Sequence, residues 1–117
     1  MKIDVRFHGL GSSEALREHA VRRILFQLSR FGHELSAVVV RVSDINGPRG
    51  GLDKRCRIAV RGRRIPVLVI EETSADASSA IDLAVGRIAR TVGRELERAR
   101  GVRLDGNVVS GPRRGRS

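Results

Sequence analysis

Apolar and polar side chains alternate along the first residues of the chain. Within residues 2–8, Ile3, Val5 and Phe7 fall on one side of an extended backbone, and polar residues fall on the other. A period of two is typical of a strand with one buried face. The sequence therefore predicts that the fold begins with a β-strand.

A helical pattern follows between about Ser13 and Phe31. Its apolar residues recur every three or four positions and form one stripe, made of Leu16, Ala20, Val21, Ile24, Leu28 and Phe31. Either serine of the preceding "GLGSS" can cap the first turn, and Gly32 can end the helix. We expect one helix here with one buried side.

Three segments of strand character come next, at residues 36–45, 54–61 and 65–72. The turn-forming stretch "NGPRGGLD" separates the first two and predicts a hairpin loop. Cys56, Ile58 and Val60 alternate with polar neighbours and should face inward. Pro66 cannot donate a ladder hydrogen bond, which favours an edge strand or a bulge for the last segment.

The last pattern is again helical and ends near Arg100. Its inward positions are Ala77, Ile81, Ala84, Ile88, Val92, Leu96 and Ala99. Ser74 or Asp76 can cap its start. Residues 101–117 carry Gly, Pro, Ser and Arg with little to bury, so we expect a folded domain over 1–100 and a disordered basic tail over 101–117.

The predicted order is β-α-β-β-β-α, which indicates an α+β fold. A strand, a helix and a strand favour a right-handed crossover between parallel strands, whereas the later hairpins must be antiparallel. We expect a two-layer sandwich, with a four-stranded sheet and both helices on one of its faces.

The composition indicates what kind of partner this fold binds. The chain has 117 residues, enough for one domain, and only 3% of them are aromatic, so the core must consist of Val, Ile, Leu and Ala. Its 23 basic and 13 acidic residues give a formal net charge of +10, which favours a polyanionic partner. All the basic residues except Lys2 and Lys54 are arginines, which bind phosphate bidentately. A GC-rich genome would produce the same preference for arginine.

Patterns that the sequence lacks exclude some kinds of site and some locations. Cys56 is the single cysteine, which excludes an internal disulfide and a cysteine-based zinc site. The chain shows no leader-like start and no apolar run of membrane-spanning length. We expect a cytoplasmic protein without a membrane partner.

The arginines of the last helix are regularly spaced. Arg87, Arg90, Arg94 and Arg98 follow one another at steps of three, four and four. At about 100° per residue they share a sector of roughly 80°, away from the apolar stripe and without Glu95 or Glu97. The first helix likewise places His19, Arg22, Arg23, Phe26 and Arg30 opposite its own stripe.

This arrangement predicts a phosphate-binding surface across both helices, although an ordinary solvated face is the alternative. The candidate RNA-binding residues are Arg22, Arg23, Arg30, Arg87, Arg90, Arg94 and Arg98. Phe26 could stack on a base, but packing against the neighbouring helix or a second copy is favoured. Gly86 and Gly93 could admit either an RNA backbone or the other helix.

The strands carry a further basic set, made of Lys54, Arg55, Arg57, Arg61, Arg63 and Arg64. It could bind a second polyanion, but keeping an exposed sheet from aggregating is the favoured explanation.

No pattern predicts an active site. His8, His19 and His33 are scattered, and Cys56 lies on an inward position, where a core residue is favoured over a nucleophile. "NGPRGG" lacks the following Lys-Ser/Thr of a phosphate loop. We expect no enzyme activity, no catalytic residue, no metal, no cofactor and no small-molecule substrate.

Three strings resemble one family. "AIDLAVGRIARTVGR" is similar to the family's Ala-Ile-Asp followed by a helix with spaced basic residues, which fall here on Arg87, Arg90 and Arg94. "EALREHA" resembles the entry of its first helix, and "NGPRGGLDKRCRI" resembles its hairpin. The family is that of the ribosome hibernation-promoting factors, also called ribosome-associated inhibitors or sigma-54 modulation proteins, and the resemblance covers about residues 1–100.

The resemblance implies a double-stranded-RNA-binding-like fold that docks its helices on small-subunit ribosomal RNA near the decoding centre. Such binding blocks the channel of messenger and transfer RNA in stressed or resting cells. The chain departs from the family where an aromatic residue usually precedes the Ala-Ile-Asp string, and at Phe26, where a basic residue is common. It ends without the C-terminal domain of long members, which implies a short form.

Two other functions remain open from the sequence. A general RNA chaperone would share the basic surface but would have no defined ribosomal site. A regulator would bind an acidic protein partner. Exposed sheet edges allow either a monomer or a weak dimer.

Overall fold

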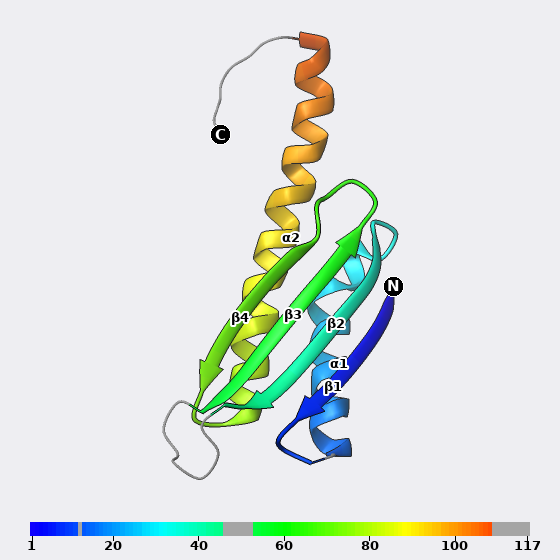
Figure 1. The fold of residues 1–117 in the computed structure, drawn as a ribbon. Helices are drawn as coiled ribbons and strands as arrows, with labels where there is room; N and C mark the ends of the chain where they lie inside the picture. Colours follow the sequence, from blue (N-terminus) through cyan, green and yellow to red (C-terminus); the bar gives the residue numbers. More distant parts are fainter. Residues whose placement is uncertain (12, 46–52, 109–117) are drawn as a thin grey trace.

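The computed structural model describes residues 1–11, 13–45 and 53–108, with the side chains described as far as Gly101. Its elements are β1 (Lys2–His8), α1 (Glu14–Leu28), the 3-10 turn η1 (Ser29–Phe31), β2 (Leu35–Asp44), β3 (Lys54–Gly62), β4 (Leu68–Ser74) and α2 (Ala77–Val108). The four strands lie in the order β1-β2-β3-β4, and both helices cover the same face of the sheet (Figure 1). The predicted α+β fold, its element order and its two layers are confirmed.

The sheet is mixed. β1 pairs with β2 in parallel, and β2 with β3 and β3 with β4 pair antiparallel, as the sequence predicted. The register of β2 against β3 shifts between Leu35 and Ala37, opposite Gly62. Pro66 lies before β4, an edge strand, so its missing N–H interrupts no ladder.

The core lies between the sheet and the helices. It contains the predicted inward residues of β2 and β3, and its largest fully buried side chains are Ile24, Leu28, Ile58, Ile81, Ile88, Leu96, Val38, Val40, Val42, Val60, Val85 and Val92. Burying each such side chain stabilises the fold by about 1.5–3 kcal/mol. This aliphatic core fixes which sides of α1 and α2 remain outward.

Side chains define where the two helices begin. The backbone N–H of Leu16 donates to Ser13 Oγ at 3.2 Å, so Ser13 caps α1. At the start of α2 the Asp76 carboxylate accepts hydrogen bonds from the Ser79 hydroxyl at 2.6 Å and from its N–H at 3.0 Å. These bonds lower the pKa of Asp76. Of the two predicted caps for this helix, Asp76 forms the hydrogen bonds.

The end of α2 corrects the sequence prediction. The helix was expected to stop near Arg100, but it continues to Val108 and extends beyond the sheet (Figure 1). Gly101 does not adopt the positive φ with which a glycine commonly ends a helix. Residues 101–108, expected within the disordered tail, are therefore helical. The predicted hairpin loop at 46–52 and the tail residues 109–117 lie outside the described residues.

None of the helices in the described part of the chain has the length and apolarity needed to cross a membrane.

Candidate nucleic-acid interface

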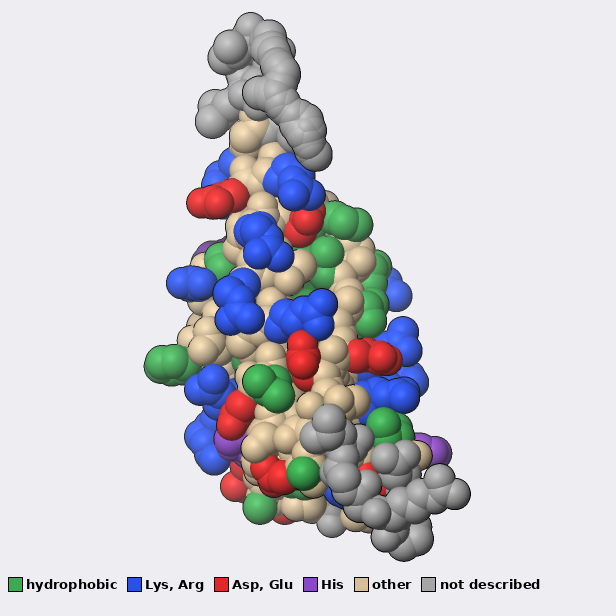
Figure 2. All heavy atoms as spheres, turned by 90° about the vertical axis from the view of Figure 1, so that its left-hand side faces the viewer, with side chains coloured by type: hydrophobic (Ala, Val, Ile, Leu, Met, Phe, Trp, Pro, Cys, Tyr) green, Lys and Arg blue, Asp and Glu red, His purple; other side chains and the backbone are tan. Residues whose placement is uncertain are grey.

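The helices α1 and α2 run side by side in the same direction. Near their starts, His19 of α1 lies 2.8 Å from Asp82 of α2, and near the end of the first helix Phe31 lies against Gly93. Their outward sides form one continuous surface, which we call the helix face. Figure 2, which views the molecule from the edge formed by β4 and α2, shows arginine side chains gathered along α2, with a few acidic side chains beside them.

Two of the predicted arginines are exposed and unpaired. Arg90 and Arg94 form no ion pair with any described residue and border an open groove of about 510 Å³ between η1 and α2. Arg30 and Arg100 also line this groove, which we call the arginine groove. Four guanidinium groups around one concave surface create a local positive potential suited to an anion.

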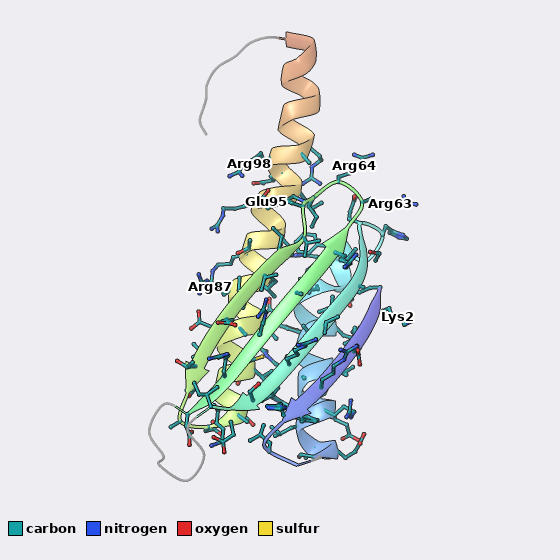
Figure 3. All side chains as sticks on the ribbon, in the orientation of Figure 1. Lys2, Arg63, Arg64, Arg87, Glu95 and Arg98 are labelled. Carbon is teal, nitrogen blue, oxygen red and sulfur yellow. The ribbon has the colours of Figure 1, made fainter. Side chains whose placement is uncertain are left out.

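Two other predicted arginines are engaged by acidic neighbours. The Arg87 guanidinium donates to the Glu72 carboxylate at 2.8 Å, which ties α2 to β4. Arg98 donates to Glu95, one turn away, at 3.0 Å (Figure 3). Exposed pairs of this kind contribute at most about 1 kcal/mol each, so a phosphate can replace the carboxylate at small cost.

The predicted residues of the first helix also differ in their exposure and in their contacts. Arg22 is exposed and has no ion-pair partner among the described residues, whereas Arg23 is partly buried. Its Nε lies 3.3 Å from the Asp82 carboxylate that also bonds His19, close enough for an ion pair but without hydrogen-bond geometry. Arg23 therefore helps to hold the helices together. Arg30 stacks its guanidinium 4.7 Å from the centre of the Phe31 ring.

The groove contains two residues that sequence reasoning did not place there. Arg100 was not a candidate, although it follows Gly93 by seven residues and so shares its side of α2. Glu97 was expected outside the arginine sector, but it also lines the groove. Both residues could have been found from Gly93, because they follow it by four and seven residues and so share its side of α2. This spacing is informative only once Gly93 is known to face η1.

The two helix glycines have different surroundings. A Cβ on Gly93 would lie 3.6 Å from the Phe31 ring, so this glycine sits against the neighbouring segment. A Cβ on Gly86 would meet only the Arg90 guanidinium, at 3.7 Å. Of the two explanations that the sequence left open, approach of the neighbouring segment accounts for Gly93 and not for Gly86.

Phe26 is an exposed aromatic residue of α1. The residue is 79% exposed, so packing against the neighbouring helix, one of the two contacts that the favoured prediction allowed, is wrong. Arg22 and Arg30 lie four residues to either side and therefore on the same side of the chain. The possible contacts for this ring are a base or a second copy of the protein.

The histidines and the cysteine do not form a reactive cluster. Residues of the described segments include no group of three or more His, Cys, Asp or Glu side chains placed to hold a metal ion. Cys56 is fully buried, and this burial raises its pKa to about 12.

We expect Cys56 in the native protein to react with iodoacetamide at pH 8 at least about 1,000-fold more slowly than in urea, because the thiolate is the reactive form. As the folded pKa is raised from 9.0 to about 12, the fold should lose stability as pH rises from 9 towards 12. Mass spectrometry of the alkylated protein measures the rate. Equal rates with and without urea would contradict the burial of this thiol.

The chain matches one family of known proteins over most of its length. Residues 3–100 match the model of the family described as sigma 54 modulation protein / S30EA ribosomal protein. The chain belongs to this family. The S30EA family match covers the four strands except Lys2, all of α1 and most of α2, and it confirms the family that the three sequence strings indicated.

Solved structures have the same fold as this S30EA family member. The N-terminal domain of Protein Y from Thermus thermophilus superposes with a TM-score of 0.66 at 26% identity, over 80% of this chain and 98% of that one. A ribosomal subunit interface protein from Coxiella burnetii superposes with the same TM-score at 20% identity, over 80% and 96% of the two chains. Among curated proteins, no significant match to the chain is found.

Proposed function

We propose that this S30EA family member is a ribosome-associated translation inhibitor, a hibernation factor that acts by occupying the ribosome. Its family and the ribosomal name of one of its structural neighbours support association with ribosomes. In this proposal the helix face docks on small-subunit ribosomal RNA near the decoding centre. The bound protein then blocks the channel of messenger and transfer RNA.

The observation that carries the proposal is the arginine groove. Arg90 and Arg94 have no ion-pair partner among the described residues, so they meet an incoming phosphate without first breaking a contact. Guanidinium groups bind phosphate oxygens bidentately, and each contact releases condensed counterions. Arg22, Arg30 and Arg100 extend the same charged surface over both helices.

The remaining predicted residues have secondary parts in the proposal. Arg87 and Arg98 bind RNA by exchanging their carboxylate partners for phosphates. Arg23 contributes by fixing α1 against α2 through Asp82. The protein needs no catalysis or cofactor for this role, and it acts in the cytoplasm under stress.

Co-sedimentation with separated small and large ribosomal subunits tests the proposal, with salt raised in steps and transfer RNA as competitor. Saturable binding to small subunits that transfer RNA opposes is the expected result. Equal, salt-sensitive binding to every RNA would instead indicate a general RNA chaperone. Retention by an acidic protein after nuclease treatment would indicate the regulator.

Phe26 supplies a sharper prediction for the same interface. We expect Phe26→Ala to weaken small-subunit binding about tenfold, since stacking on a base contributes about 1–3 kcal/mol. Phe26→Trp should keep the affinity. The free energy of unfolding should change little, because the ring is 79% exposed. Subunit co-sedimentation and urea titration provide the two measurements.

The matched control for Phe26 is Ile45→Ala, which removes another exposed apolar side chain, just after β2 and outside both helices. Unchanged subunit binding by Phe26→Ala, together with loss of a dimer in analytical ultracentrifugation, would assign the ring to a second copy of the chain.

A further inference from the structure

The sheet has a second basic surface on the side opposite the helices. The strand register places Arg6 beside Arg41, Arg41 beside Arg57, and Arg57 beside Glu71. Three arginines therefore form one row across β1, β2 and β3. Figure 1 shows that no helix covers this side, which we call the sheet face.

Such a row opposes the stability of the sheet, because like charges directly opposite on neighbouring strands repel. The two ends of the row are relieved by acids: Arg6 bonds Asp4 at 2.8 Å, and Arg57 lies 3.6 Å from Glu71. Arg41, in the middle, is exposed and has no ion-pair partner among the described residues. If the face served solubility alone, we would expect an acidic side chain beside each arginine, as beside Arg6 and Arg57 at the two ends of the row.

A shallow depression of about 300 Å³ lies along this row. Arg6, Arg41, Arg57 and Arg61 line it together with Val39, Ala59 and Val67. Arg61 is exposed and also lacks an ion-pair partner in the described part of the chain. The depression thus combines guanidinium groups with small apolar side chains.

We propose that the sheet face is a second RNA-binding surface, which takes the phosphate backbone of a single-stranded RNA segment. Neighbouring strands lie about 4.8 Å apart, so the row offers closely spaced guanidinium groups to successive phosphates. The apolar side chains can contact ribose or base. An acidic peptide would add to an exposed sheet edge through backbone hydrogen bonds, which a sheet face cannot offer. The choice of RNA as the polyanion rests on the proposed function.

Bridging of two RNAs tests the second surface directly. One unstructured oligonucleotide of about twelve nucleotides carries a donor dye and another carries an acceptor, and energy transfer is measured on the full chain at limiting protein. The wild-type protein should give transfer. The double variant Arg41→Glu/Arg61→Glu should lose at least about 90% of it while still binding one oligonucleotide.

The salt dependence gives an independent readout. Removing two phosphate contacts should flatten the slope of log affinity against log salt by about 1.4, at about 0.7 per contact with a single strand. The matched control Arg63→Glu/Arg64→Glu, in the β3–β4 connection, changes net charge equally and should keep bridging. The helix-face variant Arg90→Glu/Arg94→Glu should lose bridging but keep binding through the sheet face.

Each contrary result is informative. Transfer that persists in Arg41→Glu/Arg61→Glu would come from two copies of the protein and would overturn the second surface. Tighter binding of a poly-glutamate peptide than of RNA to this face would overturn the assignment to RNA. Failure of the wild-type protein to bind small subunits, with bridging intact, would overturn the proposed function alone.

Discussion

Reversing the charge of Arg90 and Arg94 together should weaken binding to the small ribosomal subunit by about 100-fold. Each side chain projects from α2 without an ion-pair partner among the described residues. Hydrogen bonds to charged groups contribute about 1.5–3 kcal/mol each, and about 1.4 kcal/mol corresponds to a tenfold change in affinity. Co-sedimentation at about 100 mM salt, where such contacts are still strong, measures the loss.

The matched control for this variant is Arg63→Glu/Arg64→Glu, which changes net charge by the same amount outside both helices. Equal loss of binding in the two variants would mean that overall charge, and not the arginine groove, drives association. Arg87→Glu is less suitable, because it would place a carboxylate against Glu72 and disturb the contact between α2 and β4. Circular dichroism verifies that each variant is folded.

Gly62→Ala should destabilise the protein by about 2–3 kcal/mol, a typical cost of overpacking a tight position. A Cβ here would lie 2.8 Å from the Glu34 carbonyl oxygen and 2.9 Å from the Ile65 side chain. One of these contacts is with backbone and the other with a buried side chain, so neither can move freely. Urea denaturation followed by circular dichroism gives the difference in free energy of unfolding.

Gly86→Ala is the natural counterpart, because its Cβ would have only an ordinary contact, with Arg90. Alanine stabilises a helix interior by about 1 kcal/mol relative to glycine. Stability that rises in Gly86→Ala and falls in Gly62→Ala would support both environments, and equal effects would contradict them. Weaker subunit binding by Gly86→Ala would show that Gly86 admits the RNA backbone.

The strands and the stripe of each helix could be predicted because alternation and helical spacing report burial directly. Cys56, Ile58 and Val60 illustrate this, since every second residue of β3 faces the helices. The end of α2 could not be predicted in the same way. Gly101 can either end or continue a helix, and its backbone conformation decides between the two.

The sequence predicted that the arginines of the candidate site point outward, but it did not predict their ion-pair partners. Helical rotation alone places Arg87, Arg90 and Arg94 outward. That Arg87 pairs with Glu72 depends on how α2 lies on β4, and that Arg23 shares Asp82 with His19 depends on how α1 lies on α2. Such contacts join elements distant in sequence, which no local spacing encodes.

The parallel course of the two helices has a consequence for encounters in solution. Asp82 lies in the first turns of α2 and Glu14 begins α1, whereas Arg30, Arg94 and Arg100 come towards the other end. Because the helices point the same way, these gradients of side-chain charge add. The backbone dipoles of the two helices point the opposite way and offset them only in part, which leaves the helix layer with an electric dipole along its length. A polyanion exerts a torque on such a dipole and turns the basic end forward before contact. Salt should therefore slow productive association by randomising the angle of approach as well as by weakening attraction.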